Sequence, residues 1–281
     1  MIYKTKKYIW IIVFTIVLLI LLVIGLIIGG YAQKNAKTKL PIKFIIDGKD
    51  IIDCYEQDDE YIYVFLPSYT KLENVTVEVS EKNSIFCNGK ALFDGDNIGN
   101  LEVDKIYDLT INNTAPKKFI ILRSSNVATM FINTVTGSMD AVNADKDHKE
   151  YVDITLYDAE GKLNYCSTFT DKIRGRGNST WGEDKKPYNL YLKAPAEILG
   201  MKTGDKWKML ANYYDSTNLR NKLILDYARA IQSYENFSPK SEFIDLYLNG
   251  EYNGLYLITE DIDEIDLNLG EYGFFFQSTT R

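Results

Sequence analysis

The feature that most constrains this chain is an uncharged apolar run near its amino terminus. The 21 residues from Ile9 to Gly29 carry no charged side chain and are mostly Ile, Leu and Val. A helix of that length covers about 30 Å, which is the hydrocarbon thickness of a bilayer. The apolar part of a cleaved signal peptide is shorter, at roughly 7–15 residues. We therefore expect residues 1–33 to form a cytoplasmic tip and a transmembrane anchor.

A cleaved leader is the alternative interpretation of the same run. Gly30, Tyr31 and Ala32 follow it with the small-x-small pattern of a cleavage site. Lysines flank the run on both sides, so the positive-inside count is nearly balanced. Long domains are translocated largely regardless of local charge. We therefore expect a single-pass protein of the cell membrane with residues 34–281 extracytoplasmic, or a secreted protein if cleavage occurs.

Composition limits the function of the remaining chain. A formal net charge of −7 lacks the basic footprint that phosphate backbones require, so nucleic-acid binding is excluded. The 21 tyrosines favour strands. With one histidine and no C-x-x-C pair, an ordinary zinc site is disfavoured. Cys54, Cys87 and Cys166 are expected to be thiols, although a disulfide between two of them stays open.

The first part after the apolar run has the pattern of a small all-β domain. Strand-length apolar segments lie at 42–46, 61–66 and 74–80, and the last alternates Val with polar residues. Asp-Gly and Asn-Gly pairs between them supply turns in which positive φ is cheap. We expect a sandwich-like domain over residues 34–118.

The second part, residues 119–281, mixes strands with one helix. Strands are expected at 119–122, 128–132, 151–157 and 188–192, and a hairpin over 243–258 turns at Asn249-Gly250. After Asp215-Ser216, apolar residues recur every four positions from Leu219 to Ile231, which predicts an amphipathic helix whose stripe packs into the core. Together these elements predict an α+β fold class.

One stretch within this part suggests chemistry. Two glycines alternate with arginines from Arg174 to Gly177, and Asn178, Ser and Thr follow. Glycines let a backbone turn tightly around an anion, and arginine offers a forked donor to phosphate or carboxylate. A lysine pair, Lys185-Lys186, precedes the next strand. The pattern is compatible with a nucleotide-phosphate site, but spacing alone favours the alternative, a turn held by structural salt bridges.

A series of motifs in fixed order resembles the CotH family of atypical protein kinases. The motifs are Arg-Gly-Arg-Gly-Asn-Ser-Thr-Trp at 174–181, Lys-Lys-Pro-Tyr-Asn-Leu at 185–190, Leu-Gly-Met at 199–201, Trp207 to Asp215, Leu-Arg-Asn at 219–221 and Leu246 to Tyr256. The resemblance extends over about 119–281 and does not include residues 1–118. It implies a kinase-like fold, ATP with Mg²⁺, and phosphorylation of serine or threonine in spore-coat or surface proteins.

The resemblance also implies site residues. Arg174, Arg176 and Asn178 match the glycine-arginine signature, and Arg220 matches the arginine that opens the helix; these four are expected to bind nucleotide phosphate. Lys186 matches the strand lysine and Glu260 an acidic position after the hairpin, and both are expected to be catalytic, with Glu260 in a supporting ion pair. A structural salt bridge is the alternative for each.

The chain departs from the family in one respect. A Trp-Asp-x-Asp segment, expected downstream to hold the metal, is missing, so the metal ligands are unknown and this chain alone is expected to be inactive. The acidic residues at 260–266 lack the spacing of a calcium loop. Two functions therefore remain open. One is an extracytoplasmic CotH-type kinase acting on coat or cell-envelope proteins, if the natural protein continues past residue 281. The other is a membrane-anchored, non-catalytic scaffold with a kinase-like remnant.

Overall fold

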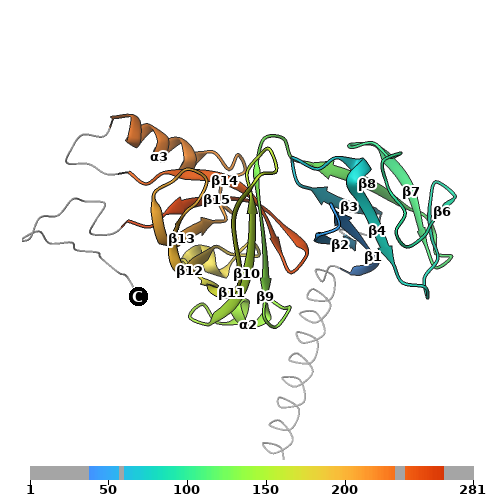
Figure 1. The fold of residues 1–281 in the computed structure, drawn as a ribbon, viewed down its shortest axis with the longest axis horizontal. Coiled ribbons are helices and arrows are strands. Elements are labelled where there is room, and N and C mark those ends of the chain that lie inside the picture. Colours follow the sequence, from blue (N-terminus) through green and yellow to red (C-terminus); the bar gives the residue numbers. More distant parts are fainter. Residues whose placement is uncertain (1–37, 57–59, 232–237, 263–281) are drawn as a thin grey trace, which may run out of the picture.

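Strands dominate the computed structural model, which describes residues 38–56, 60–231 and 238–262 (Figure 1). Within these residues the α-helices are α2 (Asp140–Ala144) and α3 (Arg220–Ile231), and two short 3-10 turns cover Leu72–Asn74 and Ser179–Gly182. The predicted α+β class is therefore wrong, and the described chain is mostly β. The helix predicted from Leu219 to Ile231 is present as α3, and the class changes because strands make up most of the other described elements.

The predicted membrane anchor at 9–29 lies outside the described residues. Along the part of the chain that is described, we find no helix that combines the length and the apolar character needed to cross a bilayer.

The first half of the chain forms one eight-stranded sheet. Its strands lie side by side in the order β4-β1-β2-β3-β8-β7-β5-β6. The elements are β1 (Lys39–Ile46), β2 (Asp50–Glu56), β3 (Tyr61–Leu66), β4 (Val75–Val79), β5 (Ile85–Cys87), β6 (Lys90–Leu92), β7 (Ile106–Ile111) and β8 (Lys117–Arg123).

This sheet curls instead of stacking two layers, which corrects the expected sandwich. Strand β4, at one end of the order, bonds to the segment that follows β6 at the other end. Val77 donates its amide to Asp96 O at 2.9 Å, and Gly95 donates to Val77 O at 2.8 Å. Alternate residues such as Ile42, Phe44 and Ile46 then face a shared interior and are buried. Curling lets one continuous sheet enclose its own core.

The second half forms a closed seven-stranded barrel in the order β10-β11-β12-β13-β15-β14-β9. Closure comes from the parallel pairing of β14 with β9, while the other neighbours run antiparallel. The elements are β9 (Ala128–Thr134), β10 (Lys149–Tyr157), β11 (Leu163–Gly175), β12 (Tyr188–Glu197), β13 (Thr203–Leu210), β14 (Ser241–Leu248) and β15 (Glu251–Glu260). Buried side chains fill the interior, including Ile173, Leu190 and Trp207.

Sheet and barrel are joined through an aromatic contact. The turn of the β14–β15 hairpin reaches β2, where Asp53 N donates to Gly250 O at 2.9 Å. Tyr252 stacks on Phe65 with ring centroids 4.3 Å apart, and Tyr247 Oη donates to Phe65 O at 2.9 Å. Three barrel aromatics thereby belong to the core of the first sheet: Phe131, Tyr157 and Tyr247.

Helix α3 lies on the outside of the barrel with its apolar stripe pointing away. Lys222 faces the barrel, donating to Ser241 O at 2.6 Å. No residue of α3 is buried, and the exposed set is Leu223, Ile224, Tyr227 and Ile231, with Leu219 just before the helix. The interpretation that the stripe packs into the core is therefore wrong, since the polar side of the helix makes the contact with β14.

Two smaller expectations can be placed on this fold. Residues 119–122 belong to β8 and pair with β3 and β7 of the first sheet, whereas they were expected to open the second part. The domain boundaries themselves stay a prediction.

Cys54 and Cys87 are buried thiols and Cys166 is an exposed one, in agreement with the interpretation that the cysteines are not bridged.

Candidate functional site

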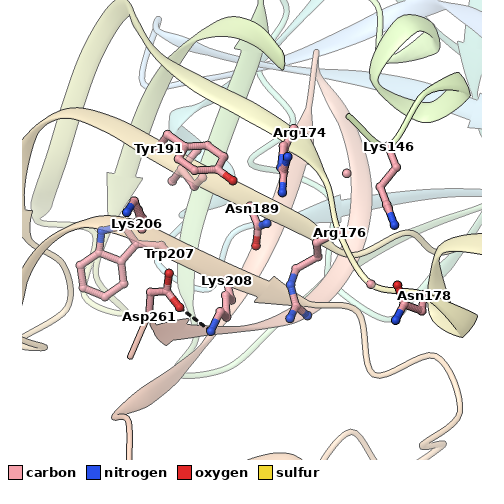
Figure 2. A pocket seen from close by; sticks show the side chains of 13 residues that line it. Lys146, Arg174, Arg176, Asn178, Asn189, Tyr191, Lys206, Trp207, Lys208 and Asp261 are labelled. Carbon is pink, nitrogen blue, oxygen red and sulfur yellow. Dashed lines mark ion pairs between the residues drawn. The ribbon is translucent and has the colours of Figure 1, made fainter. Parts of the chain in front are cut away.

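A hollow of about 430 Å³ lies on the outer face of the barrel where β11, β12 and β13 run side by side (Figure 2). Its polar lining residues are mostly cationic. They are Lys146, Arg174, Arg176, Asn178, Asn189, Tyr191, Lys206, Lys208 and Asp261.

Strand alternation explains why these side chains share a face. Residues of one strand point alternately into the barrel and out of it. Trp207 is buried in the barrel interior, so its neighbours Lys206 and Lys208 point outward. Pairing then aligns the outward residues in a row, because Asn189 lies opposite Arg174 on one side and opposite Lys208 on the other.

The two glycines of the signature shape the loop that rims this hollow. A Cβ atom on Gly175 would lie 2.3 Å from the Trp181 ring, so only glycine lets that ring pack on the strand. Gly177 has φ +86°, a left-handed conformation that side chains rarely adopt. The Arg176 amide donates to Pro187 O at 3.1 Å and so is not available to an anion. Ligand donors at these positions are therefore side chains.

Arg174 and Arg176 meet at the hollow, as the sequence motif predicts. Arg174 lies 3.3 Å from Asp147 through Nη1, and its buried Nε has no hydrogen-bond partner. Burial lowers the pKa of the Arg176 guanidinium, while nearby Asp261 and Tyr191 act in the opposite direction. An arginine remains protonated in proteins, so this shift measures loss of water around a retained positive charge.

Charge compensation in the hollow is incomplete. Asp261 is the carboxylate of the lining, and its Oδ1 pairs with Lys208. Among the described residues, no carboxylate lies within ion-pair distance of Arg176, Lys146 or Lys206. A partly desolvated cluster of cations attracts an anion strongly, because low local polarity strengthens each charge interaction.

The two residues predicted to be catalytic lie elsewhere. Lys186 donates to Trp181 O at 2.9 Å and to Glu183 O at 3.3 Å, and its amine sits 4.8 Å from the Trp181 ring centre. Buried Glu260 accepts the backbone amides of Lys202 and Lys240, each at 2.7 Å. The structure does not bring Lys186 and Glu260 together; their catalytic roles stay predictions.

The remaining predicted residues border the cationic hollow. Asn178 lies on its rim. Arg220 is exposed at the start of α3, with Nε 3.7 Å from Asp215 Oδ1. It lines an adjoining hollow of about 310 Å³ that shares Arg176 with the first. Four of the predicted phosphate ligands thus border two hollows that meet at Arg176.

The lining can be tested against the implied ATP and Mg²⁺. Forked guanidinium donors and lysine charges suit phosphate oxygens, so a nucleotide phosphate chain fits Arg174, Arg176, Lys206 and Lys208. For the metal, the described residues contain no group of three His, Cys, Asp or Glu side chains that could hold an ion. The fit therefore extends to the phosphates.

Sequence reasoning missed several residues of this site. Asn189, Lys206, Lys208 and Asp261 were not assigned to the phosphate site, yet all of them line the hollow. The available signal was alternation: Lys206-Trp207-Lys208 places one large apolar residue between two cations, the pattern of a strand with a buried inner face.

The site is thus a cationic face on a β-barrel, and comparisons with known proteins match this part of the chain to a family. Residues 173–270 match the family described as CotH kinase protein. Over 92 residues the chain is 33% identical to the inner spore coat protein H of Bacillus subtilis (strain 168). That match covers 33% of this chain and 24% of the relative, so the chain spans about a quarter of that protein. The predicted assignment to the CotH family is confirmed for this segment.

Proposed function

We propose that this chain is part of a CotH-type phosphotransferase that moves the γ-phosphate of ATP to a serine or threonine of a coat or surface protein. The observation that carries the proposal is the cationic hollow, in which five lysine or arginine side chains surround one carboxylate. The family match includes Arg174, Arg176 and Lys208. The similarity to the inner spore coat protein H of B. subtilis supports a coat protein as the acceptor.

The residues of the hollow have distinct roles in this proposal. Arg174 and Arg176 donate forked hydrogen bonds to phosphate oxygens and fix the phosphate chain against the barrel wall. Lys206 and Lys208 balance the negative charge that builds up as the terminal phosphoryl group moves to the acceptor oxygen.

Binding of ATP to the full chain tests this proposal. Titration calorimetry should show ATP binding that Arg176→Ala weakens by about 10- to 100-fold, because a hydrogen bond to a charged group contributes about 1.5–3 kcal/mol. Arg176→Lys should recover part of the loss, since it keeps the charge but not the fork. Lys90→Ala, at an exposed lysine of the first sheet, is the matched control.

The transfer itself needs a second measurement. Incubation of the longer phosphotransferase that contains this chain with ATP, Mg²⁺ and a serine-rich acceptor should yield phosphorylated acceptor detectable by mass spectrometry, and Arg176→Ala should abolish it. ATP binding that is unaffected by Arg176→Ala, or no binding at all, would contradict the proposal.

A non-catalytic scaffold is the second candidate function, and α3 favours it. Four large apolar side chains of this helix are 62–67% exposed on one stripe. Contiguous exposed apolar surface typically marks protein contact sites. If the full chain binds no ATP but captures coat or envelope proteins through α3, the scaffold function replaces the kinase.

A further inference from the structure

A second hollow lies next to the cationic one on the same barrel face. It has a volume of about 520 Å³ and shares Tyr191 with the first, so the two are continuous across β12. Its lining combines lysines with aromatic rings: Lys149, Tyr151, Phe169, Lys172, Tyr191 and Lys193.

The charge of this joint surface opposes that of the whole chain. The two hollows are lined by eight lysines and arginines and by two carboxylates, Asp261 and Asp205, whereas the chain has a net charge of −7. Within the described part of the protein, no carboxylate pairs with Lys149, Lys172 or Lys193. Arg174 pairs with Asp147 and Lys208 with Asp261, so the surface carries more positive charge than its nearby carboxylates compensate.

Strand register shows that this concentration has a cost. Lys149 lies directly opposite Arg174 on the neighbouring strand, and like charges in that position destabilise a sheet. Contacts with a tyrosine ring offset part of this repulsion. The Lys149 amine lies 4.5 Å from the Tyr191 ring centre, and the Arg174 guanidinium lies 5.8 Å from the same centre. Lys172 is held likewise, 4.5 Å from the Tyr151 ring centre. The rings lie against these cations, and Lys149 and Lys172 have no carboxylate partner among the described residues.

Phe169 adds an apolar contact point at the edge of this hollow. Strand β11 bulges there, because the pairing with β10 shifts between Val152 and Ile154. Phe169 has φ +47° and is 42% exposed. A bulky residue in that backbone region is strained, and bulges next to functional sites often redirect a side chain. This backbone conformation places a partly exposed aromatic ring beside three lysines, a position that core packing does not explain.

Resting on the proposed function, we propose that the second hollow binds an acidic, extended segment of the acceptor polypeptide. Lysine amines meet aspartate or glutamate side chains, and the rings of Phe169 and Tyr191 meet apolar groups between them. A long polyanion is disfavoured by the overall negative charge of the chain, which repels it outside this patch.

Strand geometry sets the spacing of the recognised acidic residue. Asn189, Tyr191 and Lys193 are successive outward residues of β12. Outward neighbours lie about 6.6 Å apart along a strand, so the phosphate hollow and Lys193 are separated by about 13 Å. An extended peptide covers that distance with about four residues. We expect acidic residues about four positions from the phosphorylated serine or threonine.

Fluorescence anisotropy with the full chain tests this docking site. A labelled serine peptide with aspartates four positions away should bind, and its Asn-substituted counterpart should bind at least 10-fold more weakly. The double variant Lys172→Glu with Lys193→Glu should bind the acidic peptide at least 10-fold more weakly. The milder pair, Lys172→Gln with Lys193→Gln, should also weaken binding of this peptide. Lys49→Glu with Lys82→Glu, at exposed lysines of the first sheet, is the charge-matched control and should leave binding unchanged.

A backbone variant tests the aromatic part. Phe169→Gly removes the ring, so it should weaken peptide binding severalfold. Because glycine adopts a positive φ without strain, the melting temperature should stay level or rise. A severalfold loss with a lower melting temperature would instead make Phe169 structural and overturn its docking role.

The outcomes separate docking from catalysis. The Arg176→Ala variant should no longer bind ATP but should still bind the peptide. If the unaltered chain binds the peptide but not ATP, the docking site stands and the kinase function is rejected. Equal binding of acidic and neutral peptides would overturn docking. Preference for a phosphopeptide or a single-stranded oligonucleotide over the acidic peptide would overturn it as well, by assigning the surface to another anion.

Discussion

The first sheet and the barrel treat their outward charges in opposite ways. In the first sheet, Lys43 lies opposite Glu78 and pairs with it at 2.6 Å, and Lys118 lies opposite Asp108 and pairs at 2.6 Å. On the barrel, the directly opposed pair is Lys149 and Arg174, two cations.

The difference indicates which surface carries function. Opposite charges across strands contribute about 0.2–1 kcal/mol, and like charges cost a similar amount. The first sheet follows the pattern that stabilises an exposed sheet, whereas the barrel gives up that stability where β10–β13 meet. Binding of an anion to the barrel face would recover this stability.

The largest expected effect tests whether the barrel wall supports its cations. Trp207→Ala should lower the free energy of unfolding by about 3–5 kcal/mol, because it empties a buried site, and should also lose ATP binding as Lys206 and Lys208 shift. Phe44→Ala, buried in the first sheet, should cost about as much but retain ATP binding. Denaturant unfolding and titration calorimetry check both variants. Equal loss of ATP binding would contradict the assignment of the site to the barrel.

The second prediction concerns pH. Hydrogen bonding to Glu78 raises the pKa of Lys43, whereas burial lowers the pKa of Lys185 to about 8. Between about pH 8 and pH 10 the unfolded chain therefore keeps the Lys185 proton that the folded chain has lost, and stability rises with pH. We expect a gain of about 1 kcal/mol after allowance for solvent screening.

Lys185→Met removes this titration and should flatten the rise. Denaturant unfolding at several pH values between 7 and 10 checks it, with Lys49→Met at an exposed lysine as the control. An unchanged slope in Lys185→Met would show that the amine is not desolvated in the folded protein.

The third prediction converts the barrel face into one like the first sheet. Asn189→Asp places a carboxylate between Arg174 and Lys208, and should raise the free energy of unfolding by about 0.5–1 kcal/mol. The same change should weaken ATP binding at least 10-fold, since it adds a fixed negative charge to the hollow. Asn189→Ser controls for loss of the amide. A stabilised variant that still binds ATP normally would separate the cation row from phosphate binding.

The smallest effect is expected at α3. Leu223→Lys should change the free energy of unfolding by less than about 0.5 kcal/mol, because this side chain is 67% exposed. Leu246→Ala, at a fully buried position of the barrel, should cost about 2–5 kcal/mol. Thermal and denaturant unfolding measure both. A large cost at Leu223 would show that another part of the protein covers the stripe.

Strands with a clean alternation of apolar and polar residues could be predicted from the sequence. The segment 61–66 coincides with β3, and the hairpin over 243–258 falls within β14 and β15. Strand β11 was missed because none of its first eight residues is buried, so the alternation typical of a half-buried strand is absent there. Strand β13 was missed because lysines surround its buried Trp207.

The site was predictable where backbone chemistry is specific. The glycine-arginine motif led to Arg174 and Arg176, which the fold brings to one hollow. Lys206 and Lys208 could not be found in the same way, because their place beside the arginines depends on strand register across the barrel. The apolar stripe of α3 showed that a helix was present but not which side faces the protein, since that depends on the polar contact of Lys222 with Ser241.

The aromatic contact between Tyr252, Tyr247 and Phe65 has a consequence for how the molecule comes apart. Rings from the barrel complete the core of the first sheet, so separating the two exposes apolar surface on both. Neither half should then melt alone: heating should give a single calorimetric transition whose enthalpy reflects both halves. Hydrogen exchange of the slowest amides in β3 and β14 should share one opening free energy, so that sheet and barrel behave as a single cooperative unit.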